Sequence, residues 1–161
     1  MAGDDEKTLR AMIDAWNAAL VRRDVDAMMS GYVPDAHLYD CKPPYTTDGR
    51  DAIRTLWEAC LPFFPKRFET ERHDEHLSVG ADMAVFRALH RFKTPDDPGH
   101  PAGRMWLRVT VCYRKTAQGW KVFHEHVSTP FNPMTGQIAP IVDPADLACG
   151  VDYAACKPQQ H

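Results

Sequence analysis

The sequence contains no apolar run that approaches the roughly 20 residues needed to span a bilayer. It also has no excess of basic residues, since 19 Lys and Arg stand against 22 Asp and Glu, for a formal net charge of -3. These absences argue against a membrane-spanning protein and against a nucleic-acid-binding one, which needs a positive surface. The first ten residues are acidic and lack an apolar signal region, so we expect a cytoplasmic protein.

Cysteine is sparse and irregularly spaced. Its five residues are an odd number and include no C-x-x-C pair, which argues against a disulfide framework and against a thiolate zinc site. Internal repeats and low-complexity segments are also missing. What is present is a chain of 161 residues, 44% hydrophobic and 25% charged, which is typical of one globular domain.

Three segments have the apolar spacing of amphipathic helices. In residues 4–21, apolar side chains recur every three or four positions, which predicts a helix with one buried face. Further helices are predicted over residues 25–30 and 50–64. Asp24 and Asp48 stand just before these two segments, where an aspartate can accept a hydrogen bond from the first helical turn, so we expect both to be N-caps.

The second half of the chain alternates polar and apolar side chains, which favours strands. The expected strands are residues 36–41, 68–79, 83–93, 105–115 and 120–129. Prolines predict a turn at 33–35 and loops at 42–48 and 94–103. Helices followed by strands indicate an α+β domain in which the helices lie on one face of an antiparallel sheet.

The last two predicted strands form a hairpin with polar faces, closed by a turn that contains Gly119. Because side chains alternate between faces, Trp106 and Arg108 share one face of the first strand. His124 and His126 share one face of the second strand by the same rule. An arginine and two histidines are unusual in a purely structural hairpin, so it predicts part of a site.

The last segment, residues 131–161, holds four prolines and little periodicity. We expect it to be an extended tail that packs on the domain formed by residues 1–130 or on a partner subunit.

Three stretches carry a resemblance to a known superfamily. They are RRDVDAMMSGYVPDAHLYD at residues 22–40, GRDAIRTLW at 49–57 and GWKVFHEHVSTP at 119–130. In these stretches and in its order of elements, the chain resembles the nuclear-transport-factor-2-like superfamily, in its SnoaL-like and ketosteroid-isomerase-like branch. The resemblance implies a cone, in which a strongly curved antiparallel sheet wraps around three N-terminal helices and encloses a deep pocket. It also implies a homodimer formed through the outer face of the sheet.

The resemblance points to Asp40 as a general base. In ketosteroid isomerase the base is an aspartate at the end of the first strand, sixteen residues after the aspartate that begins the short helix. Asp24 and Asp40 reproduce that spacing. A carboxylate in an apolar pocket has a raised proton affinity and can move a proton next to a carbonyl. The alternatives are that Asp40 caps the following loop or pairs with an arginine.

The oxyanion donors of the isomerase are not reproduced. Its helix tyrosine corresponds to Trp16, which has an N–H donor only, and its protonated aspartate falls near Arg108 or Thr110. If Arg108 faces the pocket, its guanidinium would bind a carboxylate or stabilise an enolate. If it faces outward, it would make a cross-strand ion pair or a dimer contact.

One of the two hairpin histidines, His124 or His126, is expected to line the pocket with Asp40 as an acid, a base or an orienting group. The alternative is a hydrogen-bonded pair within the sheet. A metal bound by His90, His124 and His126 is a further alternative. No carboxylate spacing completes such a site. The resemblance also implies a site without a metal, so we expect neither a metal nor a cofactor.

Aromatic residues from helices, loop and sheet are expected to line the pocket. The predicted substrate contacts are Trp16, Tyr32, Trp57, Phe64, His90 and His124. Such a lining suits a small hydrophobic molecule with one or two polar groups.

Two functions remain open. The first is a cofactor-independent enzyme resembling an isomerase, cyclase or dehydratase, acting on a hydrophobic carbonyl-bearing substrate. Asp40 would be its proton shuttle, and His126 or Arg108 would stabilise the oxyanion. The second is a non-catalytic ligand-binding or oligomerisation module, because GWKVFHEHVS also resembles the corresponding strand of the kinase association domain.

Overall fold

Three helices form one layer of the structure, a computed structural model that describes residues 2–145. They are α1 (Ala2–Arg22), α2 (Val25–Met29) and α3 (Arg50–Cys60), the last followed by a 3-10 turn at Leu61–Phe63. Helix α1 buries a stripe that includes Leu9, Ile13 and Leu20, each at most 5% exposed, as its apolar spacing predicted.

The two shorter helices begin in different ways. Asp24 caps α2 as predicted, because its carboxylate accepts a hydrogen bond from the backbone N–H of Ala27 at 2.9 Å. The predicted cap at Asp48 is wrong. Helix α3 begins after Gly49, which makes no side-chain hydrogen bond and has φ +92°, a conformation that favours glycine. Asp48 is instead the last residue of a short strand.

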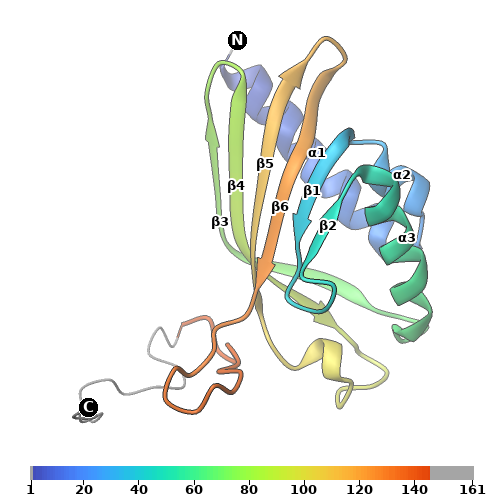
Figure 1. Cartoon of the computed structure of the whole chain (residues 1–161), viewed down its shortest axis with the longest axis vertical. Helices are drawn as coiled ribbons and strands as arrows, with labels where there is room; N and C mark the ends of the chain where they lie inside the picture. Colours follow the sequence, from blue (N-terminus) through green and yellow to red (C-terminus); the bar gives the residue numbers. More distant parts are fainter. Residues whose placement is uncertain (1, 146–161) are drawn as a thin grey trace.

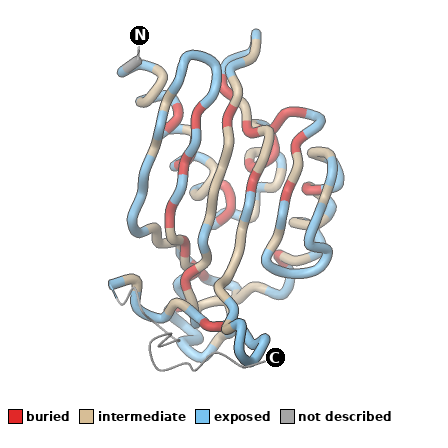
Figure 2. Tube along the Cα trace, turned by 60° about the vertical axis from the view of Figure 1, so that its left-hand side comes forward, coloured by how far each residue is buried: buried red, intermediate tan, exposed pale blue. Residues whose placement is uncertain are grey.

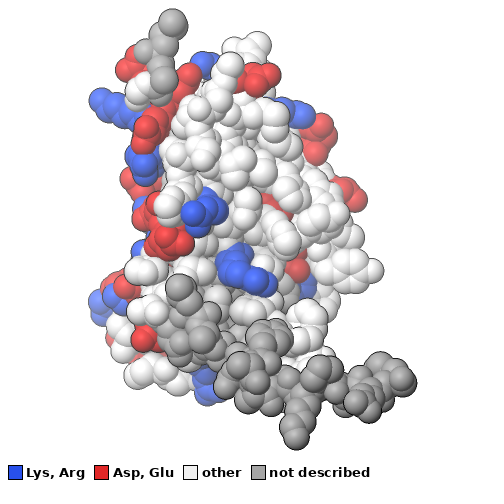
Figure 3. Space-filling view, turned by 90° about the vertical axis from the view of Figure 1, so that its left-hand side faces the viewer, with Lys and Arg blue, Asp and Glu red and all other residues white. Residues whose placement is uncertain are grey.

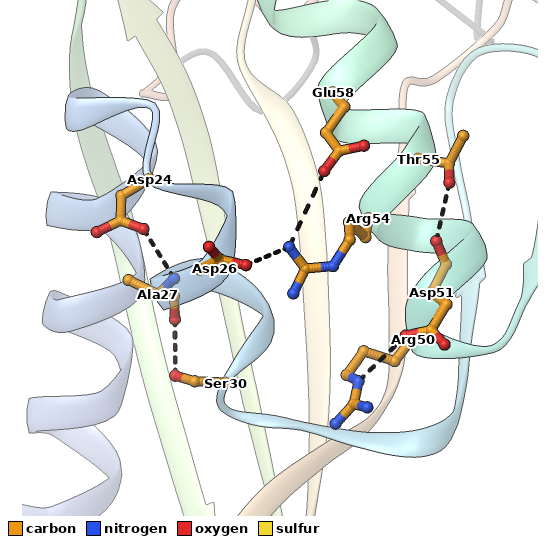
Figure 4. A network of polar contacts seen from close by, with 9 residues as sticks. All are labelled: Asp24, Asp26, Ala27, Ser30, Arg50, Asp51, Arg54, Thr55 and Glu58. Atoms are coloured by element: carbon orange, nitrogen blue, oxygen red, sulfur yellow. Dashed lines mark hydrogen bonds and ion pairs between the residues drawn. The ribbon is translucent and has the colours of Figure 1, made fainter.

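A polar network joins α2 to α3 on the molecular surface (Figure 4). Arg54 of α3 donates to Asp26 of α2 at 2.5 Å, and the same guanidinium nitrogen lies 3.9 Å from Glu58. Exposed pairs of this kind contribute at most about 1 kcal/mol. The network therefore links the two helices but adds little to the stability of the fold.

Six strands form one sheet in the order β2-β1-β6-β5-β4-β3. They are β1 (Tyr32–Tyr39), β2 (Thr46–Asp48), β3 (Glu69–Val79), β4 (Met83–Lys93), β5 (Leu107–Thr116) and β6 (Gly119–Ser128). The four long strands pair antiparallel, as predicted. Strand β1 pairs with β6 in parallel, so the sheet is mixed rather than wholly antiparallel.

Strand β1 begins earlier than predicted. Pro34 favoured a turn at residues 33–35, but the strand starts at Tyr32. Its register against β6 shifts between Tyr32 and His37, so Pro34 lies in an irregular stretch where its missing N–H disrupts no regular pairing.

The sheet curves around the helices (Figure 1), which confirms the predicted α+β cone. Buried and exposed residues alternate along the strands (Figure 2). On β4 the inward side chains are those that the alternation predicted, namely Phe86, Ala88, His90 and Phe92. A register shift in β3 between His73 and His76 adds to the bending of the sheet.

A bulge in β6 interrupts its alternation. Consecutive residues of β5 pair with Val122 and His124, so Phe123 is an extra residue in β6. Val122 faces inward before the bulge and Glu125 faces inward after it. His124, between them in the ladder, therefore faces outward.

Residues 94–103 form the predicted loop, which contains the 3-10 turn Pro101–Gly103. After β6 the chain returns to the start of β5, where Trp106 forms an isolated bridge with Ile141. The rest of the predicted tail, residues 146–161, lies outside the described residues, and the domain boundary at 130 stays a prediction. No helix within residues 2–145 is long and apolar enough to cross a membrane.

Candidate functional site

A cavity of about 590 Å³ lies between the helices and the inner face of the sheet. All three helices and strands β1, β3, β4, β5 and β6 contribute to its largely apolar wall. Its ionisable side chains are Tyr32, Asp40, Cys41, Lys42, Cys60, Arg72, His90, His100, Tyr113 and Glu125. A mainly apolar cavity with a few polar groups is the usual form of a small-molecule site.

Five of the six predicted substrate contacts line this cavity: Trp16, Tyr32, Trp57, Phe64 and His90. The indole rings of Trp16 and Trp57 meet edge to face, with centroids 5.7 Å apart. Helices α1 and α3 thus supply a rigid aromatic wall opposite the sheet.

Asp40 also lines the cavity, just beyond the end of β1. Its side chain is 11% exposed and forms a close ion pair with Lys42. The backbone N–H of Asp40 donates to the carbonyl of Tyr45 at 3.1 Å, which closes the intervening loop. The alternative of an arginine partner for Asp40 is not observed, because its partner is the lysine Lys42, and both residues line the cavity.

Glu125 and Tyr32 form a buried hydrogen-bonded pair. Tyr32 was predicted to line the cavity, whereas Glu125 was not identified from the sequence. The Tyr32 hydroxyl donates to Oε2 of Glu125 at 2.7 Å. Burial, together with the nearby charge of Asp40, raises the pKa of Glu125 to about 7. Burial and the charge of Glu125 also raise the pKa of Tyr32 well above its usual value. Glu125 can therefore hold a proton near neutral pH inside an apolar cavity.

The only signal for Glu125 in the sequence was an acidic residue between two outward histidines. Regular alternation from the buried Trp120 would place Glu125 outside, and only the bulge at Phe123 turns it inward. Burial and the charge of Glu125 raise the pKa of Tyr113 on β5, and the charge of Arg72 partly offsets this rise.

A second polar group surrounds His90. Asn17 donates its amide to the carbonyl of Ile13, so its Oδ1 is the acceptor for Nε2 of His90 at 3.2 Å. His90 is thus the tautomer with a proton on Nε2. Burial lowers the pKa of His90 to about 4, so this ring is neutral at physiological pH. Arg72 of β3 pairs with His90 across the strands.

The structure does not place Arg108, His124 or His126 in the cavity, which corrects the expectation that they would act beside Asp40. Cavity-facing residues of β5 carry odd numbers, so Arg108 lies on the outer face. On β6 the bulge turns both histidines outward. Arg108 makes no ion pair with any other described residue, so of the two roles left open for an outward Arg108, the cross-strand ion pair is not observed.

The outward histidines belong to a separate cluster on the sheet. Nδ1 of His124 lies 3.1 Å from Nδ1 of His37, so one ring must donate and the other accept. Burial and the neighbouring His37 lower the pKa of His124. The ring of Tyr39 meets His124 and His126 edge to face. This cluster corresponds to the hydrogen-bonded pair left open as an alternative, although the partner of His124 is His37.

The three-histidine metal site that was left open as an alternative is not formed by these residues. His90 faces the cavity, whereas His124 and His126 face the other side of the same sheet. Within residues 2–145, no three His, Cys, Asp or Glu side chains are grouped as metal ligands.

No curated protein matches the chain. Among solved structures it is similar to a nuclear-transport-factor-2-like protein of unknown function from Pseudomonas putida, at 26% identity and a TM-score of 0.81, covering 89% of this chain and 99% of that one.

Two more distant neighbours show the fold alone. One was provisionally identified as a calcium/calmodulin-dependent protein kinase type II association domain from Thiobacillus denitrificans, with 24% identity, a TM-score of 0.60 and coverage of 76% and 94%. The other was provisionally identified as a ketosteroid isomerase from Parabacteroides distasonis, with 18% identity, a TM-score of 0.59 and coverage of 76% and 86%.

The model of the SnoaL-like domain matches residues 9–132. This span runs from the first turns of α1 to just past β6 and contains every residue that lines the cavity. The fold, the cavity and the sequence match therefore agree. The chain belongs to the SnoaL-like domain family, within the nuclear-transport-factor-2-like superfamily.

Proposed function

We propose that this protein is a cofactor-independent enzyme that moves a proton on a hydrophobic carbonyl-bearing molecule bound in the cavity, in an isomerisation, cyclisation or dehydration. One observation carries the proposal: a single apolar cavity holds two carboxyl groups in different environments, Asp40 beside Lys42 and Glu125 beside Tyr32. Two such environments can divide the roles of base and acid between the two groups.

Asp40 is the proposed base. The ammonium group of Lys42 compensates its negative charge, and its carboxylate faces the cavity with only a small exposed fraction. A carboxylate in this position can take a proton from a carbon next to a carbonyl and return it at another position.

Glu125 and Tyr32 take over the oxyanion role that sequence analysis gave to His126 or Arg108. When Glu125 is protonated it can donate to the Tyr32 oxygen, which leaves the tyrosine O–H free for the substrate oxygen. An uncharged donor pair of this kind stabilises a developing enolate without an ionised group.

The two cysteines of the cavity do not suit nucleophilic catalysis. Burial and the charge of Asp40 raise the pKa of Cys41 to about 11, and burial raises the pKa of Cys60. Both thiols are therefore protonated at neutral pH, whereas a nucleophilic cysteine acts as the thiolate. Proton transfer suits the cavity better than acyl transfer through a thiol.

The test is exchange of the acetyl protons of 2-acetonaphthone for deuterium in D2O, followed by NMR. We expect the protein to accelerate the exchange, and Asp40→Asn to slow it by roughly 100-fold or more, the range typical of a lost general base. Asp48→Asn is the matched control, because Asp48 lies outside the cavity lining. Full exchange activity in folded Asp40→Asn protein would remove Asp40 from this role.

A binding or assembly module is the second candidate. The outer face of the sheet favours it, since Figure 3 shows charged side chains gathered along one margin and a broad area with few charges. Wild-type protein that binds 2-acetonaphthone but does not accelerate its exchange would favour binding without catalysis.

A further inference from the structure

One buried donor of the cavity wall, Nη1 of the lining residue Arg72, has no partner among the described residues. The indole N–H of Trp16, another buried donor of the wall, interacts with the Tyr32 hydroxyl. A buried donor without an acceptor costs about 1 to 3 kcal/mol. Since Nη1 of Arg72 is a donor, a ligand that supplies an oxygen acceptor would satisfy it.

The rest of the Arg72 guanidinium is already bound. Its Nη2 lies 2.6 Å from Oδ1 of Asp14 on α1, and its Nε lies 3.4 Å from Oε2 of Glu75 on β3. Two carboxylates thus compensate the single positive charge of Arg72 from the surface. Its Nη1 presents a hydrogen-bond donor with little uncompensated charge.

No free cation faces the cavity within the described part of the chain. The lining contains two cations, Lys42 and Arg72, and each is paired with a carboxylate. The remaining acid of the lining is Glu125. A carboxylate ligand would therefore lose its hydration and meet no unpaired positive charge, which is unfavourable. A neutral carbonyl loses much less hydration.

We infer that Arg72 is a specificity-determining residue, whose Nη1 donates a hydrogen bond to an uncharged oxygen of the ligand. Its ion pairs with Asp14 and Glu75 make the cavity prefer a neutral carbonyl compound over a carboxylate. The inference rests on the proposed function only in that the same cavity holds the substrate. It adds that the neutral preference is set by two carboxylates that do not line the cavity.

Equilibrium dialysis with three probes of similar shape tests the inference. The probes are 2-acetonaphthone, which is a neutral ketone, 2-naphthoate, which is a carboxylate, and 2-ethylnaphthalene, which has no oxygen. We expect the ketone to bind the wild-type protein about 5- to 10-fold more tightly than either of the others, the effect of roughly one satisfied buried hydrogen bond.

Two variants separate the donor from the charge. In Arg72→Met the ketone should lose its advantage over 2-ethylnaphthalene. In the double variant Asp14→Asn, Glu75→Gln the guanidinium keeps its place but loses its counter-charges, so 2-naphthoate should bind about 10-fold more tightly while ketone binding stays unchanged. The double variant alters two exposed carboxylates, so it remains informative if Arg72→Met fails to fold.

The inference is overturned if wild-type protein prefers the carboxylate, if none of the probes binds, or if the double variant leaves 2-naphthoate binding unchanged. Its failure is distinguishable from failure of the proposed function. Ketone binding that depends on Arg72 without deuterium exchange would contradict catalysis alone, and exchange without dependence on Arg72 would contradict the inference alone.

Discussion

Glu125 shows, at the scale of a single residue, how position changes chemistry. The same side chain on the outer face would be an ordinary solvated carboxylate. Inside the cavity, burial and Asp40 raise its pKa from 4.5 to about 7. His90 on the same inner wall moves in the opposite direction, from 6.5 to about 4, because burial disfavours its charged form.

These two shifts predict how stability depends on pH. Between about pH 4.5 and 7, folded Glu125 keeps a proton that the unfolded chain releases, so the stability it contributes at low pH is lost as the pH rises through 7. His90 contributes stability above its ordinary value of 6.5 that is lost as the pH falls toward 4. The two effects oppose one another over the shared range.

Replacing Glu125 by Gln removes one of these opposing effects. Urea unfolding should show that, as the pH rises from 4.5 to 8, the free energy of unfolding of the variant increases relative to that of wild type by up to roughly 3 kcal/mol, the value that corresponds to the pKa change. The variant should still lose stability below pH 6.5 through His90. Glu58→Gln, on the exposed face of α3, is the control. A difference between variant and wild type that stays constant with pH would contradict the raised pKa.

Residues on regular strands were predictable, and residues beside irregularities were not. The inward face of β4, with Phe86 and His90, followed directly from alternation. Glu125 and His124 exchanged faces because one extra residue, Phe123, resets the alternation of β6, and no local pattern marks that bulge. Asp40 was placed in the cavity through the resemblance, since its position depends on where β1 ends.

At the scale of elements, the start of α3 is set by backbone conformation rather than by a side-chain cap. Gly49 has φ +92°, and a β-carbon added there would meet the carbonyl oxygen of Pro34 at 3.7 Å, an ordinary contact. The obstacle to other residues is therefore backbone strain alone.

Gly49→Ala should destabilise the protein by about 1 to 3 kcal/mol, the typical cost of such a backbone strain. Asp48→Ala should change stability by less than about 0.5 kcal/mol, because Asp48 caps nothing and is exposed. Thermal or urea unfolding of the two variants side by side measures both effects. Equal losses of stability in the two variants would indicate that Asp48 does cap α3.

At the scale of the whole molecule, the outer face of the sheet is the surface through which we expect a homodimer. Thr110 lies near the centre of this face, opposite Arg87 on β4 and His126 on β6. A lysine placed there would be buried in the interface without a partner, which is strongly unfavourable.

Size exclusion with light scattering should give wild-type protein twice the mass of one chain and give Thr110→Lys the mass of one chain. Gln118→Lys, in the exposed turn between β5 and β6, should keep the wild-type mass. A single-chain mass for the wild type would contradict the dimer, and a ring larger than a dimer would favour the assembly module.

The cone itself was predictable because helix and strand periodicities are local and the resemblance supplied their arrangement. The parallel pairing of β1 with β6 could not be predicted, because no sequence pattern in either strand specifies which strand it pairs with. Tyr32 and Glu125 meet only through that pairing.

The strand order has a consequence for how the chain folds. Strand β6 lies between β1 and β5, so the first strand gains its long-strand neighbour only after the last strand has been synthesised. Until then the apolar inner face of the sheet is incomplete between β1 and β5. The pairing of β1 with β6 that completes it joins residues about ninety positions apart. Contacts of such long sequence separation slow folding and leave apolar surface uncovered for longer. Translation that stops before Gly119 would release a chain without β6, in which β1 and β5 lack the strand that joins them.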